Sequence, residues 1–194
     1  MRKSTIQSAM MNQENLSVRE LELADMDMFM SYWFNATESS LADMGVDIRK
    51  LPTKDQFRTY WESQLEMSLE RKLSYCVVWL KNDIPVGHSN TRPINFGNDA
   101  HMHLHLWNTG ERRKGVGCKF VKLALPLYFE KLQLKHLYCE PYALNPAPNR
   151  LLEKVGFDFV KEHRTNPGPS NFEQQVNLWH LSREKFEQLY KTGA

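Results

Sequence analysis

A basic, glycine-containing turn, Arg112-Arg113-Lys114-Gly115-Val116-Gly117, is the stretch of the sequence with the clearest chemical meaning. The two glycines remove side chains where the backbone must turn tightly, so successive N–H groups and a helix N-terminus can converge on a diphosphate. The cations before them add positive charge. An ordinary strand-to-helix connection with solvated charges has the same appearance, so the flanking elements must support the interpretation.

Histidines supply the second chemical pattern. His101, His103 and His105 alternate within a run that predicts a strand from 101 to 107, so all of them share one face of that strand. Histidine titrates near neutral pH and therefore suits proton transfer. Surface or packed histidines on one side of a sheet are the alternative interpretation.

Hydrophobic periodicity predicts the elements that position these residues. Helical spacing predicts helices over 25–36 and after Pro52-Thr53, and over 117–132 with a bend at Pro126. A capped helix is bracketed by Asn145-Pro146 and Gly156. Alternating or β-rich runs predict strands over 16–23, 75–80, 86–95, 101–107, 136–142, 157–161 and 174–181, with a turn at Asn82-Asp83.

Composition limits the possible functions. The chain has 194 residues, 41% hydrophobic and 25% charged, which predicts one domain over 14–194 after a flexible leader over 1–13. A net charge of +2 gives no general field for nucleic acid, and no stretch approaches the ~20 apolar residues of a membrane span. Three scattered cysteines form no disulfide framework, so a reducing cytoplasm fits best.

Two motifs resemble those of one family. Arg112-x-x-Gly115-x-Gly117 resembles the Gln/Arg-x-x-Gly-x-Gly/Ala motif of the GNAT superfamily of N-acetyltransferases. Asn145 to Phe157 resembles the second signature of that superfamily, particularly in the branch that includes ribosomal-protein N-terminal acetyltransferases. The resemblance implies an α+β fold with a mixed, mostly antiparallel twisted sheet flanked by helices. It also implies that the strand ending at Trp107 splays from the strand ending at Tyr142.

The resemblance further implies transfer of an acetyl group from acetyl-CoA, as co-substrate and without a metal, to a primary amine in a ternary complex. The acceptor would be a small-molecule amine or a protein N-terminus, and the chain a monomer or a homodimer. The pantetheine arm would pair with the backbone of Leu106 and Trp107 and with the Asn145 side chain. The diphosphate would lie on the turn, whose residues are Arg112, Arg113, Lys114, Gly115, Val116, Gly117 and Cys118.

Such chemistry needs a neutral amine. At pH 7 an amine of pKa ~10.4 is neutral in about one molecule in a few thousand, which costs about 4 to 5 kcal/mol. His103 or His105 is the candidate base, with Glu140 and Tyr142 as rival base and proton donor across the cleft; His88 and Asn90 are expected at its substrate end. Many relatives carry a tyrosine acid where this chain has Leu152, and others carry a serine where it has Pro148. The proton source for the leaving thiolate is therefore unassigned.

Two alternatives remain. The missing tyrosine fits a catalytically silent protein of the same fold that binds acyl-CoA as a sensor or scaffold. The spacing Gly97-x5-His103-x-His105 followed by Glu111 superficially resembles the metal motif of cupin barrels, and His-x-His suits a divalent metal. Against a barrel, the pattern becomes helical after Gly117 and no second Gly/Pro/His motif follows.

Overall fold

The elements of the fold come from a computed structural model that describes residues 14–107, 110 and 115–190. The predicted leader over 1–13 lies outside the described residues. The strands are β1 (Leu16–Glu20), β2 (Tyr75–Lys81), β3 (Ile84–Asn95), β4 (Asp99–Leu106), β5 (His136–Cys139), β6 (Asp158–Thr165) and β7 (Gln174–Ser182). The helices are α1 (Met26–Phe34), α2 (Glu38–Asp43), α3 (Lys54–Glu66), α4 (Val116–Pro126), α5 (Pro146–Val155) and α6 (Arg183–Tyr190).

The strands form one seven-stranded sheet in the order β1-β2-β3-β4-β5-β7-β6. Each neighbouring pair is antiparallel except β4 and β5, which are parallel. Asn82 and Asp83 have φ angles of 50° and 62° and make the two-residue turn between β2 and β3. Those angles match the twist of a tight hairpin, as predicted for this dipeptide. The α+β fold expected from the sequence is therefore confirmed.

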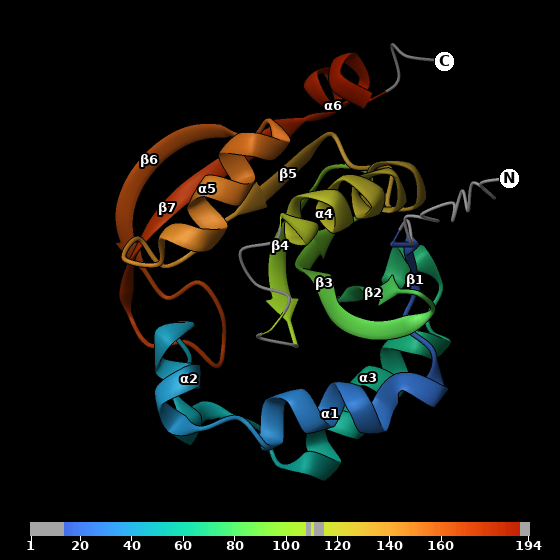
Figure 1. Cartoon of the computed structure of the whole chain (residues 1–194), viewed down its shortest axis with the longest axis vertical. Coiled ribbons are helices and arrows are strands. Elements are labelled where there is room, and N and C mark those ends of the chain that lie inside the picture. Colours follow the sequence, from blue (N-terminus) through green and yellow to red (C-terminus); the bar gives the residue numbers. More distant parts are fainter. Residues whose placement is uncertain (1–13, 108–109, 111–114, 191–194) are drawn as a thin grey trace, which may run out of the picture.

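Strand β2 divides the hydrophobic core into two parts. Tyr75, Val77 and Trp79 pack into the cluster on the α4 side, whereas Cys76 and Val78 pack against α1 and α3. Successive side chains of a strand point to opposite faces, so a run that is apolar throughout needs cover on both faces. Figure 1 shows this cover, with α4 and α5 side by side and α1, α2 and α3 grouped at the other end of the molecule.

The helix predicted over 117–132 is interrupted at its proline. The α-helical part ends at Pro126, and a π-helical turn covers Leu127–Lys131. Proline has no N–H to donate and its ring collides with the carbonyl four residues earlier, so the regular ladder cannot continue through it. Tyr128 and Phe129 lie on this turn and are fully buried. The predicted bend is thus realised as a change of helical type.

Some element boundaries differ from the prediction. The first strand ends at Glu20 because a capping box between Glu22 and Asp25 starts a 3-10 turn at once. The strand predicted over 136–142 ends at Cys139, and Tyr142 makes only an isolated bridge to Val176. Helices α2 and α6 were not predicted, because each is short and carries few apolar positions.

The start of α3 gives a test of local stability. Thr53 Oγ1 accepts from Gln56 N at 3.2 Å, and Gln56 Oε1 accepts from Thr53 N at 2.9 Å. We expect Thr53→Ala to lower the free energy of unfolding by about 1 kcal/mol, because the Gln56 N–H loses its side-chain acceptor. Thr53→Ser keeps the hydroxyl and should lose much less. The urea midpoint at constant slope measures both, and equal losses would contradict the capping role.

Candidate active site

Strands β4 and β5 separate partway along their length. They pair in parallel only at Asp99–His136, Ala100–Leu137 and His101–Tyr138. Strand β4 then continues to Leu106, whereas β5 ends at Cys139. The two strands leave between them the gap that the sequence predicted.

Backbone groups of β4 face this gap. The Trp107 N–H donates to Val86 O at 2.9 Å, so Trp107 and alternate residues before it direct their backbone groups toward β3. The intervening residues, Leu104 and Leu106, direct theirs toward the gap. This bond engages the Trp107 amide within the sheet, and the role of the Trp107 backbone as a pantetheine partner stays a prediction. The same role of the Leu106 backbone also stays a prediction.

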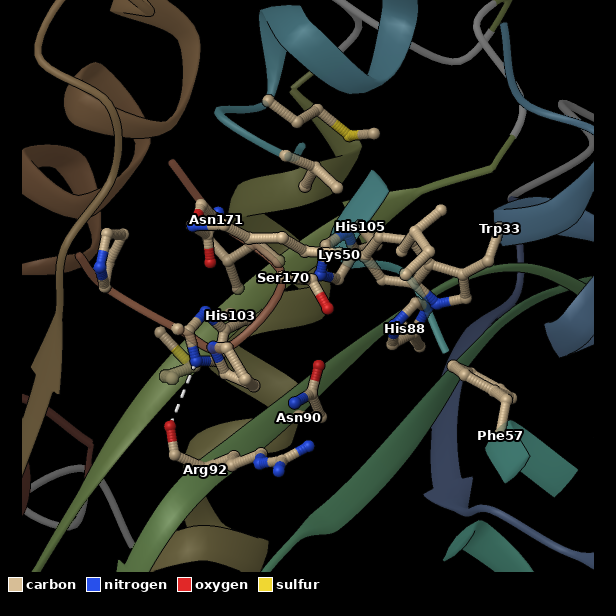
Figure 2. A pocket seen from close by; sticks show the side chains of 18 of the residues that line it. Trp33, Lys50, Phe57, His88, Asn90, Arg92, His103, His105, Ser170 and Asn171 are labelled. Atoms are coloured by element: carbon tan, nitrogen blue, oxygen red, sulfur yellow. Dashed lines mark hydrogen bonds between the residues drawn. The ribbon is translucent and has the colours of Figure 1, made fainter. Parts of the chain in front are cut away.

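A cavity of about 540 Å³ opens from the gap toward α1 and α3. Met102, Leu104 and Cys139 line it at the splayed strands. His88 and Asn90, both expected at the substrate end, line it from β3. Figure 2 shows His88, Asn90 and Arg92 following one another along that strand. The wall from α1 and α3 is mostly aromatic, and its aromatic residues are Phe29, Trp33, Phe57, Tyr60 and Trp61.

His103 is held in one tautomer by a backbone group. Its Nε2 lies 3.0 Å from Arg92 O (dashed line in Figure 2). A carbonyl oxygen only accepts, so Nε2 carries the proton and Nδ1 is the unprotonated nitrogen of the neutral ring. Burial lowers the pKa of His103, which favours that neutral form. His103 lines the cavity and can accept a proton there at Nδ1.

His105 also lines the cavity but is a weaker base. Its Nδ1 is 3.2 Å from the Tyr32 hydroxyl, and its ring stacks on His88 with centroids 4.5 Å apart. Burial, together with the neighbouring His103, lowers the pKa of His105 to about 3. A group with so low a pKa is neutral at pH 7 and takes up protons poorly. Of the two candidate histidines, His103 is better suited to act as base.

His88 is a fully buried histidine beneath the cavity. Its Nδ1 accepts from Trp107 Nε1 at 2.7 Å, and since an indole N–H only donates, His88 Nε2 carries the ring proton. That Nε2 has no hydrogen-bond partner among the described residues. Burial, followed by the nearby His105 and His103, lowers the pKa of His88 well below its ordinary value. The histidines of the site are therefore uncharged imidazoles at neutral pH.

Glu140 and Tyr142, the rival candidates, lie outside the cavity lining among the described residues. Glu140 Oε2 is 3.4 Å from His101 Nδ1, and Oε1 is 3.1 Å from His163 Nε2. The hydrogen bond from His101 holds the pKa of Glu140 below its ordinary value. The Tyr142 ring lies edge-on to Phe172, with centroids 6.2 Å apart. The structure thus brings together His103 and His105 but not these two.

The start of α5 lines the cavity with groups that cannot donate a proton. Asn145 caps the helix by accepting from Ala147 N at 3.3 Å, and both Asn145 and Pro148 line the cavity. Leu152 is fully buried in the main core. Neither position that carries a hydroxyl in relatives offers one here.

Asn149 is a structural residue that sequence reasoning missed. Its Nδ2 donates to Asn145 O at 2.8 Å and to Tyr142 O at 3.2 Å. Its Oδ1 accepts from Trp179 Nε1 at 2.8 Å and from Asn177 Nδ2 at 2.9 Å. Asn149 therefore fixes the start of α5 to β7. The type of residue alone gave no signal, because the asparagine sits inside a helix of ordinary pattern.

Glycine occupies positions 115 and 117 of the basic turn for two different structural reasons. Arg112, Arg113 and Lys114 lie outside the described residues. Gly115 precedes α4 with φ +75°, and a Cβ there would meet nothing within 4 Å. At Gly117 a Cβ would lie 2.9 Å from Leu151 Cδ1, so this glycine lets α4 approach α5 closely. Val116 is buried and Cys118 half-buried at the first turn of α4.

The splayed sheet with a helix that starts beside the gap defines an acetyltransferase-like fold. The family model for the acetyltransferase (GNAT) domain matches residues 15–158, and the chain belongs to this family. No curated protein matches the chain. The open order of the sheet, with β1 and β6 at its edges, overturns the cupin alternative, which requires a closed barrel.

Solved structures share the fold at low sequence identity. Spermidine N-acetyltransferase from Vibrio cholerae, in complex with CoA and spermine, has a TM-score of 0.71 at 16% identity, covering 88% of this chain and 97% of that one. RimL, a ribosomal-protein alpha-N-acetyltransferase in complex with coenzyme A, has 0.70 at 10%, covering 88% and 95%. An uncharacterized protein from Bacillus halodurans has 0.67 at 16%, covering 92% and 89%.

The described residues contain neither a candidate metal site nor a candidate membrane span. They contain no group of three or more His, Cys, Asp or Glu side chains placed to hold a metal ion. No helix in the part of the chain that the structure describes has the length and apolar content needed to cross a membrane.

The buried histidines predict acid-sensitive stability. The pKa of His105 falls from the ordinary 6.5 to about 3 on folding, so the unfolded chain binds more protons between these values. The free energy of unfolding should therefore fall as pH drops below 6.5, by at most about 1.4 kcal/mol per pH unit for each such histidine. His88 and His103 add to the effect, since their pKa values are also lowered.

Chemical denaturation between pH 7 and pH 4.5 measures this dependence. We expect His105→Asn to reduce the slope of unfolding free energy against pH, because one of the buried titrating groups is gone. Trp33→Phe, which changes a ring packed on His105 at 4.7 Å but no titrating group, should leave the slope unchanged. An unchanged slope in His105→Asn would show that its pKa is not depressed.

Proposed function

We propose that the chain transfers an acetyl group from acetyl-CoA to the primary amine of an acceptor, by direct attack in a ternary complex. The observation that carries this proposal is the gap between β4 and β5, which is continuous with a cavity lined by His103. A thioester lying in the gap and an amine lying in the cavity would meet at the splayed strands.

Three features of the described residues fit acetyl-CoA. The backbone of Leu104 and Leu106 faces the gap and offers an unpaired strand edge to the pantetheine amides. Space is open around Gly115, immediately before the N-terminus of α4, where backbone N–H groups favour a diphosphate. Asn145 lines the cavity beside the gap. The basic residues of the turn remain predicted diphosphate partners.

His103 is the proposed base. The amine nitrogen forms a bond to the thioester carbonyl carbon, loses its proton to His103 Nδ1, and the carbon–sulfur bond breaks with release of the CoA thiolate. The bond from Nε2–H to Arg92 O keeps Nδ1 available throughout. The aromatic wall supports this role, because a low-dielectric surrounding disfavours the ammonium form of the acceptor before it reacts.

A silent acyl-CoA sensor is the second candidate. The observation in its favour is that α5 presents Pro148 and the buried Leu152 where relatives carry a hydroxyl. The two functions separate in one assay. Thiol release from acetyl-CoA that depends on an added amine supports the enzyme, whereas binding of CoA without such release supports the sensor.

The role of His103 predicts a specific kinetic change. We expect His103→Ala to lower kcat by about 10²- to 10⁴-fold, the range for loss of a general base, with little change in the affinity for acetyl-CoA. The part of the rise of rate with pH that follows deprotonation of His103 should disappear, because the group that titrates is gone. Steady-state thiol release and calorimetric titration with acetyl-CoA measure the two quantities.

His136→Ala is the matched control for this variant. His136 bonds to His180 at 3.0 Å and is outside the described lining of the cavity, so its removal should leave kcat unchanged. Equal rates for wild type and His103→Ala would eliminate His103 as base while leaving the transfer reaction itself in place.

A further inference from the structure

The charged residues of the cavity lining are all cationic. Arg92 and Lys50 belong to it, and the described residues that line it include no aspartate and no glutamate. Lys50 is exposed, and its Nζ donates to Asn171 O at 2.7 Å. Arg92 is half-buried. The electrostatic character of the cavity therefore suits an anionic group.

The Arg92 guanidinium is held by an aromatic ring. Its Cζ lies 4.8 Å from the centroid of the Tyr60 ring, and the Tyr60 hydroxyl is 2.5 Å from Ser74 Oγ. Within the described residues no carboxylate forms an ion pair with Arg92. Stacking on a ring leaves the N–H edge of a guanidinium free for the bidentate bonds that match a carboxylate. The arginine is thus positioned in advance and has donors left to use.

Arg92 lies close to the proposed base. His88, Asn90 and Arg92 alternate along β3, and Asn90 stands opposite His103 in the register with β4. The carbonyl of Arg92 itself accepts from His103 Nε2. Arg92 and His103 both line the cavity, so one small molecule in it can place an anionic group at the guanidinium and an amine at His103.

The rest of the lining indicates the size and polarity of the remainder of that molecule. Phe29, Phe57 and Trp61 contribute apolar surface, and the volume of about 540 Å³ is in the range of small-molecule sites. We propose that the acceptor is a small primary amine with an apolar body and a carboxylate, and that Arg92 binds this carboxylate. The inference rests on the proposed function and deepens it by naming the class of acceptor.

The same lining disfavours polyamines. A polyamine carries several ammonium groups, and each one taken from water needs a carboxylate or comparable partner. The described lining supplies imidazoles, amides and two cations instead. The spermine of the Vibrio cholerae complex therefore belongs to a relative with the same fold and does not indicate the acceptor of this chain.

Matched amines test the proposal by turnover. The first pair is phenylalanine and phenethylamine, which differ by a carboxylate beside the amine. The second pair is 4-(aminomethyl)benzoate and benzylamine, which differ by a carboxylate across the ring from the amine. In at least one pair we expect kcat/KM to be about 10- to 100-fold higher for the carboxylate, the worth of a charge-assisted bidentate contact. A preference for the uncharged partner in both pairs, or spermidine as the best acceptor, would overturn the proposal.

Variants identify the residue responsible. Arg92→Met should bring the ratio of kcat/KM within the preferred pair close to one, and Arg92→Lys should restore part of it. Arg58→Met is the matched control, because Arg58 lies on α3 outside the described cavity lining and pairs with Asp27 at 2.5 Å. It should keep the wild-type ratio. An unchanged ratio in Arg92→Met would overturn the assignment.

A binding measurement separates this inference from the transfer reaction. By calorimetry we expect 3-phenylpropanoate to bind at least tenfold more tightly than 3-phenylpropanamide, with the difference lost in Arg92→Met. That result without any acetyl transfer would support the anion site and refute the proposed enzyme. Acetyl transfer without a binding difference would support the enzyme and refute the anion site.

Discussion

The short parallel register between β4 and β5 is the constraint on which the site depends. Asn98 O accepts from Lys135 N at 2.7 Å and from His136 N at 3.0 Å, which fastens the strands together where they begin. At the other end β5 stops after four residues, while β4 runs on with β3 as its only strand neighbour in the described sheet. The pair His101–Tyr138 is the last between these strands, and because the twist of a sheet rotates each strand relative to its neighbour, β4 and β5 separate beyond it. The exposed edge of β4 and the cavity beyond it both follow from that divergence.

The alternation of side chains along β3 and β4 then determines which residues line the cavity. One face of each strand packs on α4, so the other face carries His88, His103 and His105 against the first helices. No carboxylate among the described lining compensates a charge there, and burial keeps these imidazoles neutral. Neutral rings can donate and accept in fixed directions without paying the desolvation of an ion. The hydrogen bond to Arg92 O thus leaves Nδ1 as the ring nitrogen of His103 that can accept a proton.

The sequence predicted features that are determined locally. The hairpin at Asn82-Asp83, the caps of α3 and α5 and the disruption at Pro126 depend on backbone properties of the residues themselves, and all appear. Contacts between residues that are distant in the sequence have no such local signal. Glu140 looked like a base at the lip of the gap, but His163 on β6, which no pattern connects to it, binds its carboxylate. The bond from the Trp107 amide to Val86 O likewise depends on the register between β3 and β4, which no local pattern specifies.

The closed side of the cavity depends on segments with the weakest sequence pattern. Gly45 O, just after α2, accepts from Asn171 Nδ2 at 2.9 Å and from Gln174 Nε2 at 3.1 Å. Asp47 N donates to Ser170 O at 2.8 Å. These bonds join the region after α2 to the loop before β7 across more than half the chain, and they bound the cavity opposite the sheet. A polypeptide acceptor needs an open slot through which its chain can continue. The hydrogen bonds on this side of the cavity leave no such slot there, which agrees with the small amine proposed as acceptor.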